Sequence, residues 1–185
     1  MSDRGTSHSR VCVGCGQFPL IGFTNIDVDP DAYADLYLEV PPLPFDDDSV
    51  DEIYAGHYLE HLTRERALDF LEECRRCLIP GGLLGIVVPD TREIFKRYLM
   101  GAPDAIEYPQ RVWWDVANLD AMCALILYST VQGSPHRWMY DERTLAHALT
   151  ASGFTDLKPI DRYRDPRIAQ GAWYQFGYDC RKGGE

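Results

Sequence analysis

The sequence is poor in positive charge and has no long apolar run. Of its 185 residues, 18 are Lys or Arg and 29 are Asp or Glu, which gives a formal net charge of −11. Because contact with a phosphate backbone requires a basic surface, we do not expect nucleic acid as a partner. No apolar stretch approaches the roughly 20 residues that cross a bilayer, and residues 1–10 lack the apolar segment of a secretory signal. We therefore expect a cytoplasmic protein without a membrane partner.

The six cysteines are not expected to form disulfides, because the chain shows no export signal. Two Cys-x-x-Cys pairs, Cys12 with Cys15 and Cys74 with Cys77, leave a four-cysteine zinc site as an alternative. We disfavour that site. The first pair is split between a predicted strand and the loop after it, and the second lies on the apolar stripe of a predicted helix, where cysteine is normally a small buried side chain. No metal is expected.

Length and composition indicate a single globular domain with a sizeable core. We predict a disordered tail over residues 1–10 and one domain over 11–185. Residues 101–133 form the least regular region, and we take 101–135 as an insert that is either a lid over the substrate or the interface of a homodimer.

The chain is organised around Val11-Cys12-Val13-Gly14-Cys15-Gly16, an apolar run that leads into a Gly-x-Gly turn. A second short apolar run, Asn25-Ile26-Asp27-Val28-Asp29, ends in carboxylates. The order of strand, glycine loop, strand and acid is typical of an open α/β sheet that binds a nucleoside, because the acid accepts hydrogen bonds from ribose hydroxyls.

The connection between these two runs is too short for a normal helical crossover. Pro19 and Gly22 indicate a loop in place of the helix. Phe18 stands where a dinucleotide-binding fold carries its third glycine, and a dinucleotide also requires a full helix facing its pyrophosphate. These departures disfavour NAD as the cofactor.

The rest of the chain alternates between strand and helix patterns. Strands are predicted over 10–13, 24–28, 36–40, 50–55, 83–88, 155–160 and 172–180. Helices are predicted over 64–78 after the cap Thr63, from Asp90 to about 100, over 121–128, and over 142–152 between Asp141 and Gly153. We expect Pro80-Gly81-Gly82 to end the helix before it.

Six blocks in this order resemble the class I S-adenosylmethionine-dependent methyltransferases, and among them the type 11 methyltransferase-domain group. The blocks are Val-Cys-Val-Gly-Cys-Gly, Asn-Ile-Asp-Val-Asp-Pro, Leu-Pro-Phe-Asp-Asp-Asp-Ser-Val-Asp-Glu-Ile-Tyr, His-Tyr-Leu-Glu-His-Leu, Glu-Cys-Arg-Arg-Cys-Leu-Ile-Pro-Gly-Gly-Leu-Leu and Val-Pro-Asp. The resemblance implies a Rossmann-like α/β fold. It has a seven-stranded sheet, mostly parallel with the last strand antiparallel, and helices on both faces.

The chain departs from that family in its shortened first crossover and in having no N-terminal cap helices before the first strand. In the family, the leading segment often covers the substrate. Here residues 101–133 take that role, or the pocket is open, or a partner closes it.

The resemblance also implies roles for the glycine loop and the second strand. Gly14, Cys15 and Gly16 would lie against the methionine part of S-adenosyl-L-methionine. Asp27 would bind the ribose hydroxyls, and Val28 would lie beside the adenine.

Further cofactor contacts are implied after the third and fourth strands. Glu39 would face the adenine amino group, and the backbone of Val40 would flank the ring. Gly56 and His57 would line the pocket under the sulfonium.

The sequence His57-Tyr58-Leu59-Glu60-His61 also matches the His-x-x-Glu-His pattern of a zinc hydrolase, with two histidines one helical turn apart. We keep a zinc hydrolase only as a remote alternative, because the motif directly follows a strand of a cofactor-binding pattern. For methyl transfer, the candidate catalytic residues are His57, His61 and His136. His136 precedes Trp138 and Tyr140, which form either a packed aromatic loop or a substrate wall.

We predict a methyltransferase that acts on a small-molecule or sugar-like acceptor and releases S-adenosylhomocysteine. Oxygen or carbon acceptors are favoured, because no Asn/Asp-Pro-Pro-Tyr block follows the fourth strand. Arg162, Arg164 and Arg167 are either solvated or bind an anionic acceptor. The alternative is a non-catalytic cofactor-binding or interaction module with the same fold.

Overall fold

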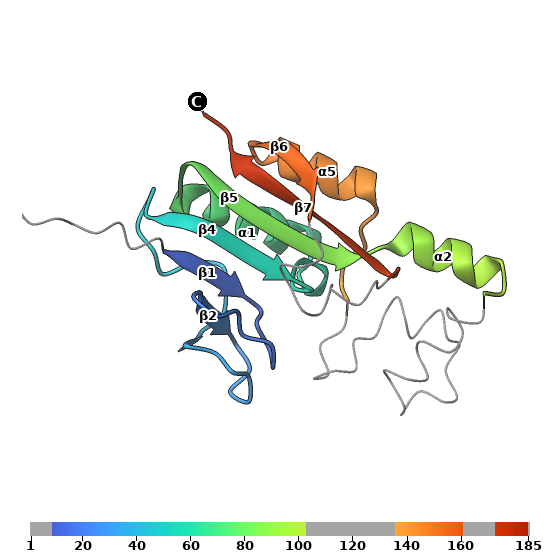
Figure 1. Ribbon diagram of the computed structural model, residues 1–185, viewed down its shortest axis with the longest axis horizontal. Helices are drawn as coiled ribbons and strands as arrows, with labels where there is room; N and C mark the ends of the chain where they lie inside the picture. The colour runs from blue at the N-terminus through green and yellow to red at the C-terminus, as the bar shows by residue number, and fades with distance from the viewer. Residues whose placement is uncertain (1–8, 103–135, 161–172, 185) are drawn as a thin grey trace, which may run out of the picture.

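The computed structural model describes residues 9–102, 136–160 and 173–184. A seven-stranded sheet has the order β3-β2-β1-β4-β5-β7-β6 (Figure 1). Its strands are β1 (Arg10–Val13), β2 (Thr24–Asp27), β3 (Leu36–Tyr37), β4 (Val50–Gly56), β5 (Leu78–Pro89), β6 (Phe154–Pro159) and β7 (Gln175–Lys182). The helical elements are η1 (Leu59–His61), α1 (Arg64–Cys77), α2 (Thr91–Leu99) and α5 (Glu142–Ala151).

The direction of the strands confirms the predicted mixed sheet. β3, β2, β1, β4 and β5 pair in parallel, so their carboxyl ends meet at one edge. β7 pairs antiparallel with both β5 and β6, as predicted for the last strand. The order along the chain reverses between β1 and β4, and that reversal point is where open α/β sheets bind their ligands.

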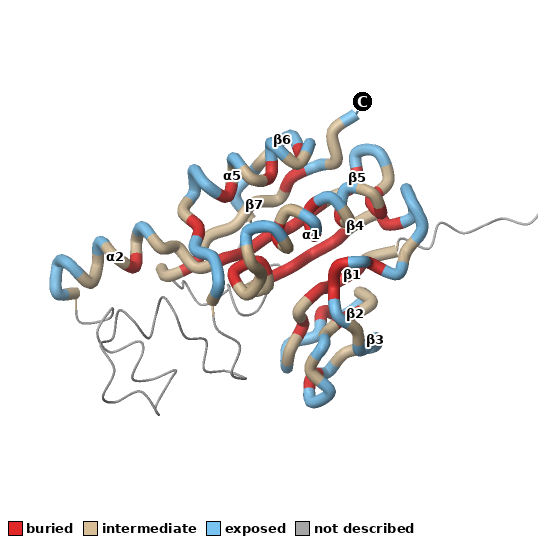
Figure 2. Tube along the Cα trace, turned by 180° about the vertical axis from the view of Figure 1, so that it is seen from behind, coloured by how far each residue is buried: buried red, intermediate tan, exposed pale blue. Residues whose placement is uncertain are grey.

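The main core lies on the face of the sheet that α1 and α5 cover (Figure 2). Strand residues alternate between the two faces, and the helical side chains that meet this face recur at helical spacing. They are Ala67, Phe70, Leu71, Cys74 and Cys77 from α1 and Leu145 and Leu149 from α5. Because each buried aliphatic or aromatic side chain contributes about 1.5–3 kcal/mol, this face supplies most of the hydrophobic stabilisation.

The opposite face carries a smaller core of Cys12, Cys15, Leu20, Tyr54 and Val87. Between β1 and β2, a loop rather than a helix packs against this core and contributes Cys15 and Leu20 to it. This is the direct result of the shortened first crossover.

The loop that replaces the first helix is held by the buried side chain of Asn25. Its Oδ1 accepts a hydrogen bond from the N–H of Leu20 at 2.8 Å, and its Nδ2 donates to the carbonyl of Phe23 at 3.0 Å. One amide therefore satisfies backbone groups that a helix would have paired internally. The predicted loop is confirmed, but the role of Asn25 in holding it was not predicted.

Helix ends follow the predicted caps. The side chain of Thr63 accepts from Arg66 N, that of Asp90 from Glu93 N, and that of Asp141 from Thr144 N. Among the helices that the structure describes, α5 alone has a reciprocal capping box. Gly153 follows α5 with φ +84°, a left-handed conformation that glycine adopts without a Cβ penalty.

Several predicted bounds were wrong. The third strand has two residues instead of five, because Pro41 and Pro42 follow closely and lack amide donors. The helix before Pro80-Gly81-Gly82 already ends at Cys77, and these three residues lie inside β5. The predicted tail over 1–10 is too long at its inner end, since Arg10 begins β1 and Ser9 N donates to Asp51 Oδ2 at 2.8 Å.

Other predictions fall outside the described residues. They concern most of the tail, the insert 101–135 with its helix over 121–128, and the three arginines at 162, 164 and 167. Within the described ranges, none of the helices has the length and apolar character needed to cross a membrane.

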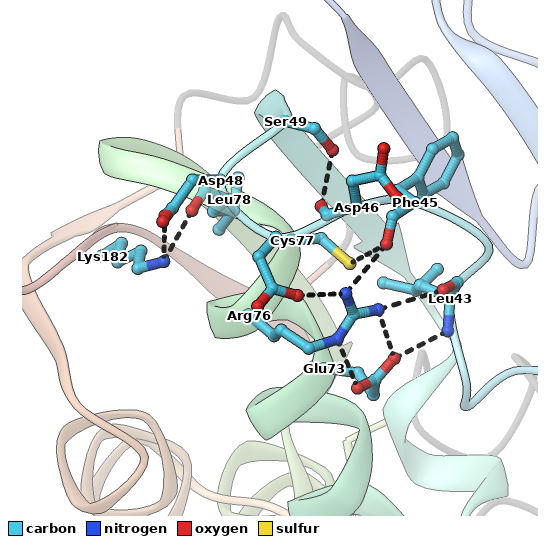
Figure 3. A network of polar contacts seen from close by, with 11 residues as sticks. Leu43, Phe45, Asp46, Asp48, Ser49, Glu73, Arg76, Cys77, Leu78 and Lys182 are labelled. Atoms are coloured by element: carbon cyan, nitrogen blue, oxygen red, sulfur yellow. Dashed lines mark hydrogen bonds and ion pairs between the residues drawn. The ribbon is translucent and has the colours of Figure 1, made fainter.

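The loop between β3 and β4 is fixed to α1 by one arginine (Figure 3). The guanidinium of Arg76 donates to the carboxylates of Glu73 and Asp47 at 2.8 and 2.7 Å, and to the carbonyls of Phe45 and Leu43 at 2.9 and 3.2 Å. Its planar donor fork suits several acceptors at once. This network takes the place of regular backbone pairing in a proline-rich segment.

We therefore expect Arg76→Ala to lower the free energy of unfolding by about 1–3 kcal/mol, because two carbonyls and two carboxylates lose a charged donor. Lys158→Ala, which removes one exposed ion pair with Asp156, should change it by less than about 0.5 kcal/mol. Urea unfolding followed by circular dichroism measures both, and equal effects of the two substitutions would contradict the network's role.

Candidate active site

The carboxyl ends of β1 and β4 place the glycine loop beside the segment that follows Gly56. Gly14 and Gly16 have φ of +69° and +52°, left-handed values that explain why glycine stands at both positions. The N–H of Gly14 donates to the carbonyl of Ile26 at 2.9 Å, so the loop turns back over the end of β2.

Asp27 ends β2, and its carboxylate is held by backbone donors. Its Oδ2 accepts from the N–H of Gly16 at 2.8 Å, and its Oδ1 accepts from the N–H of Asp29 at 3.0 Å. Each carboxylate oxygen keeps acceptor capacity for a further hydrogen bond. The next side chain, Val28, is 67% exposed and so offers an apolar surface beside this carboxylate.

The side chain of Tyr58, to which no role was assigned from the sequence, lies at this edge. A Cβ on Gly14 would lie 2.8 Å from Tyr58 Cδ2, so Gly14 makes room for this ring. The Tyr58 hydroxyl donates to the carbonyl of Val40 at 2.7 Å, and its ring packs at 5.1 Å from that of Phe70. Burial raises the pKa of Tyr58 above its usual value. Tyr58 therefore forms a wall between the first loop and the third strand.

Two residues that were assigned to the cofactor direct their side chains elsewhere. Cys15 is fully buried, with its Sγ near the carbonyl of Tyr33 at 3.8 Å, so its side chain points into the smaller core. Glu39 forms a 2.8 Å ion pair with Arg66, and its side chain is 77% exposed.

His57 lies directly after β4 in a left-handed conformation, with φ +54°. Its Nδ1 lies 3.1 Å from Glu60 Oε1, and its Nε2 contacts Gln175 Oε1 at the start of β7. Both ring nitrogens are thus engaged, which fixes the imidazole at the junction of two strands. Gln175 was missed, because nothing in the local sequence marks a partner 118 residues away.

Glu60 is 1% exposed and lies beside three histidines. Its side chain contacts His57, and its backbone carbonyl accepts from Arg137 N at 2.7 Å, which brings the segment before α5 close to η1. His61 and His136 meet edge to face, with ring centroids 5.0 Å apart. The three predicted catalytic histidines therefore surround one carboxylate, whose importance the sequence did not reveal.

The electrostatics of this cluster favour a charged carboxylate and a neutral imidazole. Burial tends to raise the pKa of Glu60, but the hydrogen bond from His57 and the nearby histidines outweigh it, so the pKa lies below its ordinary value. Burial lowers the pKa of His136 to about 4. At neutral pH, His136 is therefore unprotonated and available as an acceptor.

The zinc arrangements considered from the sequence are not formed. η1 is a 3₁₀ helix of three residues, so His57 and His61 do not lie one turn apart on a helix. Cys12 and Cys15 belong to the smaller core, whereas Cys74 and Cys77 belong to the main core on the other face of the sheet.

Comparisons with known proteins concern the fold and one segment of the chain. Residues 25–86 match the family described as "Methyltransferase domain". A search of curated proteins gives no match. The fold is similar to a SAM-dependent methyltransferase from Archaeoglobus fulgidus, with a TM-score of 0.56 and 16% identity over 94% of this chain and 86% of that chain.

Two further solved structures have the same fold. One is a SAM-dependent methyltransferase from Thermotoga maritima, described as a possible histamine N-methyltransferase (TM-score 0.61, 15% identity, 94% of this chain and 82% of that chain). The other is a predicted methyltransferase from Haloferax volcanii in complex with the Trm112 methyltransferase activator (TM-score 0.57, 17% identity, 96% of this chain and 84% of that chain).

The chain has the fold of the class I S-adenosylmethionine-dependent methyltransferases, and residues 25–86 match a methyltransferase domain. The cofactor that this fold and the matched segment imply is S-adenosyl-L-methionine. The family resemblance seen in the sequence is confirmed.

The two loop glycines allow a matched test of the site. We expect Gly14→Ala to lower the free energy of unfolding by about 2–4 kcal/mol, because backbone strain adds to overlap with the Tyr58 ring. Gly16→Ala has a similar φ but nothing within 4 Å of the added Cβ, so it should cost only about 1–2 kcal/mol. Urea unfolding measures both losses of free energy. Equal losses would show that the Tyr58 ring does not require a glycine at position 14.

Proposed function

We propose that the chain is an active methyltransferase that transfers a methyl group from S-adenosyl-L-methionine to a hydroxyl or carbon atom of a small-molecule or sugar-like acceptor. The observation that carries the proposal is the carboxylate of Asp27. It lies at the end of β2, fixed by the N–H groups of Gly16 and Asp29, one strand from the reversal between β1 and β4.

The residues around that carboxylate fit a nucleoside. Asp27 is preorganised to accept hydrogen bonds from ribose hydroxyls. This favours binding, because its side chain loses little conformational entropy when the ligand binds. The exposed side chain of Val28 offers an apolar surface to the adenine ring, whereas Val40 is buried and Glu39 is paired with Arg66. Gly14 and Gly16, on either side of the buried Cys15, are partly exposed and have no Cβ between their backbone and the methionine part.

The methyl-donor end of the cofactor would lie toward Gly56 and His57. S-adenosyl-L-methionine supplies the methyl group when bound. The chain's task is to align the attacking atom with the methyl carbon at about 3 Å, which supplies most of the acceleration of a direct displacement. The immobilised ring of His57 contributes a rigid wall there, since Glu60 and Gln175 hold both of its nitrogens.

A hydroxyl acceptor must also lose its proton. His61 and His136 are the candidate proton acceptors, because they lie beside Glu60 next to that wall and His136 is neutral at physiological pH. Trp138 and Met139, each 41% exposed, extend this area with an apolar surface suited to a small organic acceptor.

The competing proposal is a non-catalytic cofactor-binding module. The ring of Tyr58 favours it, because this side chain fills part of the edge where a cofactor would lie. An active enzyme turns over S-adenosyl-L-methionine with an acceptor from a panel of hydroxyl compounds, whereas a module binds it without forming S-adenosylhomocysteine.

Asp27→Asn should weaken S-adenosylhomocysteine binding about 10- to 100-fold, because hydrogen bonds to a charged acceptor contribute about 1.5–3 kcal/mol. Isothermal titration calorimetry measures the dissociation constant. The control is Asp31→Asn, an exposed carboxylate in the following turn, which should leave the affinity within about threefold.

Thermal melting of both variants verifies that they are folded. An unchanged affinity in a folded Asp27→Asn protein would remove Asp27 from the cofactor site and with it the basis of the proposal.

A further inference from the structure

Glu60 has a buried oxygen that no described residue satisfies. Its Oε1 lies beside His57, but its Oε2 is inaccessible to solvent and has no hydrogen-bond partner. A buried, charged oxygen without a partner is costly, and native proteins generally satisfy such atoms with a donor, a water or an ion. This atom therefore points to a ligand.

Two imidazoles lie next to that carboxylate. One ligating atom from each of Glu60, His61 and His136 lies within 4.8 Å of the other two. Donor atoms around a Zn²⁺ ion at its usual bond lengths are separated by about 3.4 Å, so small side-chain rotations would complete the geometry. Two histidines and one carboxylate are a frequent ligand set for divalent transition metals.

Space for an ion exists at this place. Glu60 and His136 line a cavity of about 10 Å³, together with Thr91 at the start of α2 and Tyr140. This is about the volume that one water molecule requires. A bound ion or its water ligand would thus occupy existing space.

We propose that Glu60, His61 and His136 bind one divalent transition-metal ion, such as Zn²⁺ or Mn²⁺, and that this ion binds the hydroxyl of the acceptor. Nitrogen ligands disfavour Ca²⁺ and Mg²⁺, which prefer an all-oxygen shell. Three protein ligands leave coordination positions open for the acceptor. His57 does not ligate; its ring holds Glu60 in place.

The second half of this proposal rests on the proposed function. Coordination to the ion makes a hydroxyl proton easier to lose. The O–H bond then breaks with the proton passing to water, the oxygen forms a bond to the methyl carbon, and the carbon–sulfur bond breaks to release S-adenosylhomocysteine. In this scheme His61 and His136 activate the acceptor through the ion and do not accept its proton themselves.

The test uses the full chain after treatment with a chelator. Co²⁺ is added as a spectroscopic probe, and Zn²⁺ binding is measured by calorimetry. We expect about one equivalent of metal, a visible Co²⁺ absorption band, and a loss of affinity of at least tenfold in Glu60→Gln and His136→Asn. His147→Asn, on the exposed side of α5, is the matched control and should bind as the unaltered chain does.

Thermal melting shows whether a variant that fails to bind metal is still folded. Zn²⁺ should raise the melting temperature of the unaltered chain and of His147→Asn, but not of His136→Asn. Absence of saturable binding in the unaltered chain, or equal affinity in His136→Asn and His147→Asn, would overturn the metal site.

Two further measurements test the acceptor role of the ion and the binding of the cofactor separately. Catechol, a probe with adjacent hydroxyls, should shift the Co²⁺ spectrum of the unaltered chain, and an unchanged spectrum would overturn the acceptor role of the ion. S-adenosylhomocysteine binding is measured on the metal-free chain. If it persists while metal binding fails, only the metal proposal falls; if it is absent while metal binds, the proposed methyltransferase function falls.

Discussion

The hydrogen bond between the Gly16 N–H and the Asp27 carboxylate is the interaction on which the site depends. In a fold of this class, a helix after β1 would normally fix the glycine loop against the sheet. Here that helix is absent, and the carboxylate at the end of β2 holds the loop directly. The same acid therefore stabilises the loop and offers its remaining lone pairs to a ligand. Loss of a phosphate-facing helix is tolerable for a nucleoside cofactor that carries no phosphate.

Glu60 has the corresponding role on the other side of the sheet reversal. Its backbone carbonyl holds the segment at 136–138, and its side chain holds His57, so one buried residue brings together η1, the end of β4 and the chain before α5. Burying a carboxylate at such a junction costs free energy of folding, because the charge loses its hydration. Its retention with an unsatisfied oxygen is explained most simply by a function that uses the charge.

Much of the fold could be predicted from the sequence because its signals are local. The spacing of Phe70, Cys74 and Cys77 gave α1, and the cap at Asp141 gave the start of α5. The residues expected at the site lie at the carboxyl edge of the sheet, but the residues that hold them in place were not predicted. Gln175 reaches His57 from an antiparallel strand, and Tyr58 covers Gly14 through a turn. These contacts depend on tertiary packing, so no periodicity or motif in one sequence reveals them.

The central claim is that a nucleoside binds at the carboxyl ends of β1, β2 and β4. A crystal structure of the chain grown with S-adenosylhomocysteine tests this most directly. It should show both ribose hydroxyls within about 3 Å of the Asp27 carboxylate, with the adenine beside Val28 and the sulfur toward His57. A ligand bound elsewhere, with the Tyr58 ring closing this edge, would contradict the account.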